Sequence, residues 1–162
     1  MLQIVEVKTP EQLGEIKKLF LEYETWLDFD LQFQDFEKEV ASLPGKYAPP
    51  LGAIFLALSD QNSAGCIALR PIKENICEMK RFFVRAQFRG KGIGKKLAIA
   101  NIDKAGEIGY AKMCLDTHNS FQAAIGIYKK LGFKKTLPYY YNPMPDVSYW
   151  ELDLNKKKSK GF

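Results

Sequence analysis

Apolar residues recur along the chain with two different spacings, and the spacing changes near residue 53. Before that point they repeat every three or four positions, as they do on one face of a helix. The first such stripe consists of Leu13, Ile16, Phe20, Tyr23 and Leu27. Thr9 is suited to cap this helix, Pro10 fits its first turn, and Gln12 completes a capping box. The pattern therefore predicts a long amphipathic helix that begins at about Thr9.

A second helical pattern follows and is then stopped. Its apolar positions are Phe33, Phe36, Val40 and Leu43, and Pro44-Gly45 ends it. The next segment, Ala48–Gly52, contains two adjacent prolines and cannot lie inside a helix. We therefore expect two N-terminal helices and then a stiff connection to the rest of the chain.

From Ala53 onward the apolar runs are short and separated by turn-like segments, a pattern typical of strands. Together with an N-terminal run, the predicted strands are Leu2–Val7, Ala53–Leu58, Cys66–Ile72, Ile76–Val84, Ala111–Asp116, Phe133–Leu137 and Val147–Leu154. The breaks Asp60–Gly65 and Lys73–Asn75 are short, which favours antiparallel neighbours. We expect one helix to end at Ile108 before Gly109, and another over Phe121–Leu131.

The crossover from Ile76–Val84 to Ala111–Asp116 contains a helix, so these two strands can lie parallel. The element order β-α-α-β-β-β-α-β-α-β-β predicts an α/β (α+β) fold. Its sheet is mixed and mostly antiparallel, with about seven strands and helices on both faces. With 162 residues in all, we expect one domain over 1–154 and a basic flexible tail over 155–162.

The net charge of +5 depends on that tail, which contains four lysines and no acidic residue. The other 20 Lys and Arg face 19 Asp and Glu, so the body is nearly neutral and a nucleic-acid partner is not expected. The three cysteines are too few and too scattered for a disulfide framework or a metal site. Without a signal-peptide pattern or an apolar run of about 20 residues, we expect no membrane association and a cytoplasmic location.

Three alternating glycines, Gly90, Gly92 and Gly94, connect a strand to a helix. Glycines there let backbone N–H groups converge on an anion, and the start of the helix adds unpaired donors. The flanking basic residues are Arg89, Lys91, Lys95 and Lys96. The spacing fits neither G-x-x-x-x-G-K-[ST] nor G-x-G-x-x-G, which excludes the usual mononucleotide and dinucleotide loops. The loop therefore predicts a pyrophosphate site of another kind.

Two motifs resemble one known family. Arg89–Gly94 matches [QR]-x-x-G-x-[GA], and Ala124–Phe133 resembles A-x-x-x-Y-x-x-x-G-F. Both are signatures of the GNAT superfamily of acyl-CoA-dependent N-acyltransferases, whose element order the chain also follows. The resemblance implies a sheet splayed between its fourth and fifth strands, with acetyl-CoA as co-substrate. It also implies an amine acceptor, which would be a small molecule, an amino acid or a peptide. We expect no metal, and a homodimer stays open.

The resemblance also implies the coenzyme-binding residues. The pyrophosphate would lie on the backbone N–H groups of Arg89, Gly90, Lys91, Gly92, Ile93, Gly94 and Lys95. The pantetheine arm would pair with the backbone near Phe83 and Val84, which could also bind the oxyanion. Many relatives have an asparagine where this chain has Phe121, and Asn119 is a candidate substitute.

Two side chains are candidates for acid–base chemistry, which N-acyl transfer requires. Glu78 matches the family's glutamate base, acting directly or through water, and its alternative is a surface carboxylate paired with Lys80 or Arg81. Tyr128 matches the tyrosine that protonates the leaving thiolate, and its alternative is a core aromatic residue. His118 is the single histidine, and no Ser or Cys nucleophile accompanies it, which favours direct transfer over an acyl-enzyme.

The acceptor site is less defined. Aromatic and acidic residues that could bind a cationic amine are Tyr23, Trp26, Asp28, Phe29, Asp30 and Tyr139–Tyr141. The alternative is that these aromatic residues complete the core. A second function also stays open, namely a non-catalytic acyl-CoA binding module or sensor that retains the loop without the chemistry.

Overall fold

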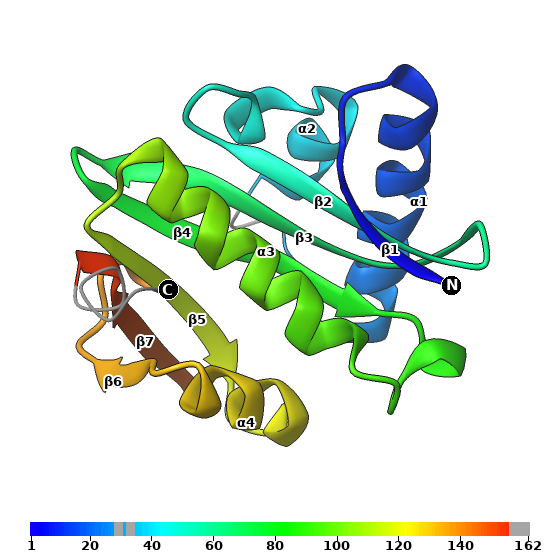
Figure 1. The fold of residues 1–162 in the computed structure, drawn as a ribbon. Helices are drawn as coiled ribbons and strands as arrows, with labels where there is room; N and C mark the ends of the chain where they lie inside the picture. Colours follow the sequence, from blue (N-terminus) through cyan, green and yellow to red (C-terminus); the bar gives the residue numbers. More distant parts are fainter. Residues whose placement is uncertain (28–30, 32–34, 156–162) are drawn as a thin grey trace.

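A seven-stranded sheet in the order β1-β2-β3-β4-β5-β7-β6 organises the protein (Figure 1). The structure is a computed structural model that describes residues 1–27, 31 and 35–155. Its strands are β1 (Leu2–Glu6), β2 (Ala53–Ser59), β3 (Asn62–Lys73), β4 (Ile76–Val84), β5 (Lys112–His118), β6 (Lys134–Thr136) and β7 (Val147–Asp153). Its helices are α1 (Pro10–Leu27), α2 (Phe36–Ala41), α3 (Ile93–Ile108) and α4 (Gln122–Lys130), with 3₁₀ turns η2 (Gly45–Tyr47) and η3 (Ala86–Phe88).

Helices cover both faces of the sheet, as predicted from the element order (Figure 1). Helix α3 packs on one face, where Ile67, Leu97 and Met113 belong to one buried cluster. Helices α1 and α2 pack on the other, where Phe20 and Phe36 join a second cluster. The predicted capping box at the start of α1 is present, because Thr9 and Gln12 each accept the backbone N–H of the other. The described residues of the two N-terminal apolar stripes therefore lie in this second cluster or pack against it.

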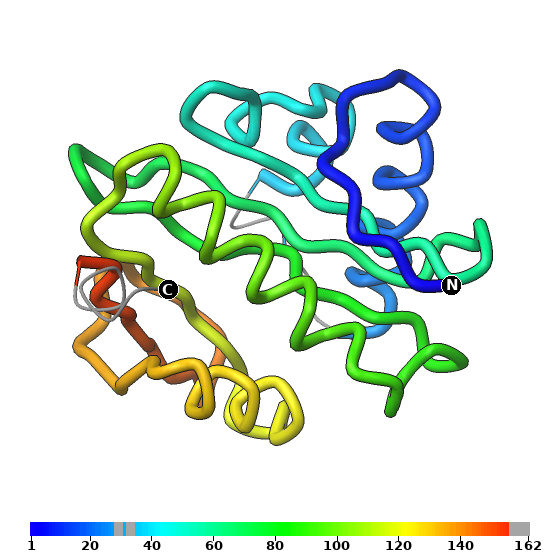
Figure 2. The backbone as a smooth tube through the Cα atoms, in the orientation of Figure 1, coloured from blue at the N-terminus to red at the C-terminus, as the bar shows by residue number. Residues whose placement is uncertain are grey.

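Strands β4 and β5 are the one parallel pair among the described strands, and they separate along their length. Their pairing stops at Glu78 and Cys114, although β4 continues to Val84 and β5 to His118. Figure 2 follows the two strands as they diverge. The predicted splay between the fourth and fifth strands is confirmed, and it opens a gap that side chains from both strands line.

A β-bulge shapes β4 beside this gap. The β3–β4 register shifts between the Cys66–Phe83 and Ala68–Lys80 pairs, so β4 has one extra residue there. Arg81 lies in the bulge with a φ of 57°. Its guanidinium points to α2, where it binds Glu39 and lies over the ring of Phe36. The bulge therefore connects the gap to the α2 side of the fold.

Several predicted boundaries are wrong by small amounts, and one break is wrong in kind. The turn expected over Asp60–Gly65 is only Asp60–Gln61, both with positive φ, and β3 already begins at Asn62. Gly65 marks close strand contact rather than a turn, since a Cβ there would lie 2.6 Å from the Phe83 carbonyl oxygen. His118 lies beyond the predicted strand Ala111–Asp116, yet it is the last residue of β5. Phe33 and tail residues 156–162 lie outside the described residues.

The close approach at Gly65 leads to a stability prediction. We expect Gly65→Ala to lower the free energy of unfolding by about 1–3 kcal/mol, because the new methyl group would push β3 away from β4. Gly14→Ala is the matched control, since Gly14 is exposed in α1 and a Cβ at that position would have no neighbour within 4 Å, and we expect it to stabilise slightly. Urea titration measures both, and equal effects would contradict the strand-contact explanation.

Candidate active site

The glycine loop lies between the end of β4 and α3, on the side where β4 and β5 have separated. Gly90 and Gly92 have φ values of 79° and 80°, which L-residues with side chains rarely adopt, and Gly92 is the N-cap of α3. Gly90, Lys91 and Gly92 are exposed, whereas Ile93 is buried and anchors the first turn. A Cβ at Gly94 would lie 3.2 Å from Phe82 and Ile127. The loop therefore presents exposed backbone on a firmly packed helix start.

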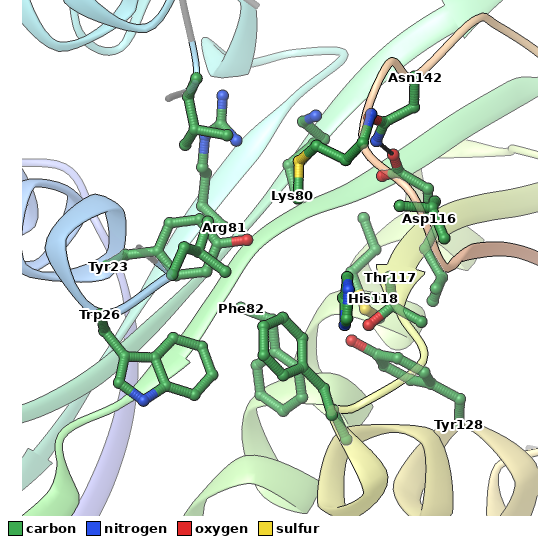
Figure 3. Close-up of a pocket in the computed structure, with 18 residues that line it drawn as sticks. Tyr23, Trp26, Lys80, Arg81, Phe82, Asp116, Thr117, His118, Tyr128 and Asn142 are labelled. Carbon is green, nitrogen blue, oxygen red and sulfur yellow. Dashed lines mark hydrogen bonds between the residues drawn. The ribbon is translucent and has the colours of Figure 1, made fainter. Parts of the chain in front are cut away.

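A cavity of about 100 Å³ lies in the gap between β4 and β5 (Figure 3). The residues that line it come from α1 (Tyr23, Trp26, Leu27), the segment after it (Leu31), β4 (Met79–Phe82), β5 (Leu115–His118), α4 and its N-cap (Phe121, Ala124, Tyr128), the β6–β7 connection (Asn142, Met144) and the start of β7 (Val147). Most of these side chains are apolar or aromatic, and a few are polar. This combination is typical of small-molecule sites.

Tyr128 lies at the junction of the core and the cavity. It is a core aromatic residue, and its role as an acid stays a prediction. The side chain is 5% exposed, and its ring packs 6.1 Å from Phe82 and 5.7 Å from Phe133, measured between ring centres. It also lines the cavity. Burial raises the pKa of its hydroxyl well above the ordinary value, so the group stays protonated and able to donate.

Glu78 is buried rather than on the surface. Its side chain is 1% exposed, Oε1 accepts a 2.7 Å hydrogen bond from Arg70 Nε, and Oε2 accepts a 2.5 Å bond from the Tyr139 hydroxyl. Lys80 and Arg81, the partners in the alternative description of Glu78, make neither of these bonds. Glu78 closes the β4–β5 ladder and lies behind the described cavity lining rather than in it.

Asp116 is a carboxylate of the cavity wall that the sequence patterns did not single out. Asp116 Oδ2 accepts hydrogen bonds from the Tyr140 hydroxyl and from Asn142 Nδ2, the latter at 2.8 Å. Its one signal in the sequence is an acidic residue directly after the apolar run Met113–Leu115, which by itself indicates only the end of a strand. Tyr139 and Tyr140 thus hold two carboxylates in place, while Tyr141 is 82% exposed.

Two cations of β4 line the same cavity. Lys80 is 8% exposed, and burial lowers its pKa to about 8, although the negative charges of Glu78 and Asp116 oppose that shift. Arg81 is 3% exposed and binds Glu39 with both Nε and Nη2, at 2.7 and 2.9 Å. The Arg81 charge is therefore compensated from α2, on the far side of the cavity wall.

Aromatic rings form the wall on the α1 side. Trp26 stacks on Phe121 with ring centres 4.9 Å apart, and the Arg89 guanidinium lies 4.9 Å from the Trp26 ring centre. Phe121, which occupies the family's asparagine position, therefore contributes an apolar surface. Asn119 is exposed and outside the described lining, and its backbone N–H binds the Asp146 carbonyl. The predicted acceptor residues Asp28, Phe29 and Asp30 lie outside the described residues.

Arg89 also contacts the strand that was expected to bind the pantetheine arm. Arg89 Nε donates a 2.8 Å hydrogen bond to the Val84 carbonyl oxygen. Phe83 is 6% exposed and packs toward α1, with its ring centre 6.0 Å from that of Tyr23. The structure thus brings Phe83, Val84 and Arg89 together at the end of β4.

Within 1–27, 31 and 35–155, no group of three or more His, Cys, Asp or Glu side chains is arranged to hold a metal ion. None of the helices in the same part of the chain is long and apolar enough to cross a membrane. All three cysteines are buried and free.

Comparison with known proteins agrees with this geometry. The model of the acetyltransferase (GNAT) family matches residues 13–133. An uncharacterized N-acetyltransferase of Schizosaccharomyces pombe is 39% identical over 157 residues, which cover 96% of each chain. A GNAT acetyltransferase of Staphylococcus aureus has the same fold, with a TM-score of 0.78 and 23% identity over 95% of this chain and 99% of its own. YncA of Salmonella typhimurium, solved with its cofactor acetyl-CoA, has a TM-score of 0.69 and 17% identity over 95% and 94% of the two chains. The chain therefore belongs to the acetyltransferase (GNAT) family.

Proposed function

We propose that the protein transfers an acetyl group from acetyl-CoA directly to a primary amine. The observation that carries this proposal is the cavity between the separated strands β4 and β5, which lies next to the glycine loop and has Tyr128 in its wall. Family membership supports acetyl transfer, and the YncA complex supports acetyl-CoA as the donor. The acceptor would be a small molecule, an amino acid or a peptide amine.

In this proposal the coenzyme lies along the end of β4 and the start of α3. Backbone N–H groups from Arg89 to Lys95 would bind the pyrophosphate, helped by the positive end of the α3 dipole. The backbone of Phe83 and Val84 would pair with the pantetheine arm. For that pairing the Arg89 side chain would have to leave the Val84 carbonyl oxygen. The thioester would then reach the cavity near Tyr128.

The proposed chemistry has three proton-dependent steps. The acceptor ammonium loses a proton, and its nitrogen attacks the thioester carbonyl carbon. The C–S bond breaks as the tetrahedral intermediate collapses, and the departing thiolate takes a proton from the Tyr128 hydroxyl, which is regained when the new amide nitrogen loses its second proton. We assign the first proton to Glu78, which matches the family's glutamate base. A water molecule would have to carry this proton, because Arg70 and Tyr139 bind the two carboxylate oxygens and the side chain lies outside the cavity lining.

Thiol release from acetyl-CoA in the presence of a panel of primary amines tests the function. We expect amine-dependent release for the wild type, and a loss of turnover in Glu78→Gln with coenzyme binding retained. Tight coenzyme binding without release for any amine would instead favour the non-catalytic binding module.

Tyr128→Phe tests the proposed acid separately. We expect kcat to fall about 100-fold, the lower end of what general acid catalysis contributes, while the dissociation constant for acetyl-CoA stays unchanged. Tyr110→Phe is the matched control, because Tyr110 is also a buried tyrosine and its hydroxyl binds the Leu51 carbonyl far from the cavity lining. Equal kcat values for the two variants would rule out the role of Tyr128.

A further inference from the structure

Asp116 lies across the separated strands from Lys80. Glu78 and Cys114 are paired neighbours on β4 and β5, and side chains two residues farther along a strand return to the same face. Lys80 and Asp116 are those next residues, and both line the cavity (Figure 3). Asp116 is therefore on the face of Glu78 but, unlike Glu78, it borders the open space. It is the one carboxylate among the described residues that line this cavity.

The Asp116 carboxylate is fixed through one oxygen. Oδ2 accepts hydrogen bonds from the Tyr140 hydroxyl and Asn142 Nδ2, whereas Oδ1 has no hydrogen-bond partner within the described part of the chain. Tyr149 from β7 holds the same connection, because its hydroxyl donates a 3.0 Å bond to the Tyr140 carbonyl. A carboxylate oriented in this way can offer its second oxygen to a ligand without rearranging.

The charged and titratable side chains around Asp116 come from several elements. Lys80 and Arg81 face the cavity from β4, His118 from β5, Tyr23 from α1 and Tyr128 from α4. Arg81 is compensated by Glu39, and burial lowers the pKa of Lys80 to about 8. A lysine with that pKa is still mostly protonated at pH 7, so Lys80 keeps a positive charge across from Asp116. Asp116 supplies the one negative charge among the described lining residues, beside a wall of apolar and aromatic side chains.

Building on the proposed function, we propose that Asp116 binds the ammonium group of the acceptor, and that the acceptor is a primary amine with an apolar body packed against Tyr23, Trp26 and Phe121. A carboxylate and nearby aromatic faces both attract an ammonium group and so strengthen its binding. Burial of the apolar body against the aromatic wall adds hydrophobic binding free energy. Asp116 then selects and orients the amine, while the thioester lies toward Tyr128 on the other side of the cavity.

The test compares two ligands of similar shape that differ in charge. Binding of 2-phenylethylamine and of 2-phenylethanol to the full chain, saturated with coenzyme A at pH 7, is measured by calorimetry. We expect the amine to bind wild type about 10- to 100-fold more tightly than the alcohol, the range for a hydrogen-bonded charge. We expect Asp116→Asn to remove most of this preference without changing coenzyme A affinity or the melting temperature. Asp146→Asn is the matched control, because Asp146 is an exposed aspartate of the β6–β7 connection, which also contains Tyr140 and Asn142. This variant should retain the wild-type preference for the amine.

The outcomes separate this inference from the proposed function. An unchanged amine preference in Asp116→Asn overturns the role of Asp116, even if the enzyme acetylates amines. Equal, weak binding of both ligands to the wild type overturns it as well, as does a wild type that acetylates ethylamine as efficiently as 2-phenylethylamine. A preference that Asp116→Asn abolishes supports the site even if no thiol is released, in which case only the catalytic proposal fails.

Discussion

We expect Glu39→Ala to lower the free energy of unfolding by about 3–5 kcal/mol, the usual cost of removing one partner from a buried ion pair. The side chains of Glu39 and Arg81 are 3% and 2% exposed, and two hydrogen bonds join them. Without Glu39, the Arg81 guanidinium would stay buried beside Phe36 and would lose two hydrogen bonds and the opposite charge that accepts them. Because Arg81 forms the β4 bulge, this change should also disturb the cavity wall.

Urea titration at pH 7 measures this cost, and Glu37→Ala is the matched control. Glu37 lies in the same helix and is exposed, so we expect its replacement to change stability by less than about 0.5 kcal/mol. A loss below about 1 kcal/mol for Glu39→Ala would mean that the pair is not the connection between α2 and β4 that the structure indicates.

The same pair predicts a pH dependence. Burial alone would raise the pKa of Glu39, but the hydrogen bonds and charge of Arg81 outweigh burial and leave the pKa below the ordinary value of 4.5. A lowered pKa in the folded state means that the contribution of Glu39 is complete above pH 4.5 and is lost as the pH falls through the folded-state pKa. The stability difference between the wild type and Glu39→Ala should therefore shrink in acid, and a constant difference would contradict this assignment.

The second large effect is expected at the glycine loop. We expect the double substitution Gly90→Val with Gly92→Val to weaken coenzyme A binding about 30- to 1000-fold. Each β-branched residue would have to adopt a φ near 80°, and each left-handed residue costs about 1–2 kcal/mol. The loop would relax away from the strained conformation, and its backbone N–H groups would no longer converge. Calorimetric titration with coenzyme A measures the change in affinity.

Gly14→Val separates this conformational effect from a general effect of losing glycine. Gly14 lies in the exposed part of α1, where a side chain meets no neighbour, so coenzyme A affinity should remain unchanged. If the loop double variant binds coenzyme A as tightly as wild type, the proposed pyrophosphate site is wrong. Because Gly90 and Gly92 are exposed, we expect the double substitution to weaken coenzyme A binding more than it lowers the free energy of unfolding.

Much of the fold could be predicted because its elements carry local signals. The capping residues Thr9 and Gln12 located the start of α1, and Gly109, with a φ of 109°, located the end of α3. The break at Asp60–Gly65 was placed wrongly because a glycine serves turns and close strand contacts equally well. Local sequence cannot tell these uses apart, since the contact of Gly65 is with Phe83, far along the chain.

The candidate site was predictable only in part. Tyr128 and the glycine loop were selected because their motifs have fixed spacing within one segment. Asp116 was missed because its significance comes from Tyr140 and Asn142, which reach it from the β6–β7 connection. The alternative to Glu78 as a base was a surface carboxylate paired with Lys80 or Arg81, but Arg70 reaches it from β3 and Tyr139 from the β6–β7 connection.

The sequence by itself determined the order of the elements, the glycine loop and the family resemblance, because helix periodicity, strand alternation and loop conformation depend on residues close together in the chain. Only the tertiary structure decided which charged groups border the cavity and which are enclosed behind it. That distinction depends on where β4 and β5 stop pairing and on which distant side chains fill the space beyond. Glu78 and Asp116 both lie on strands and both are acidic, yet the separation of the two strands encloses the first and leaves the second beside the open cavity.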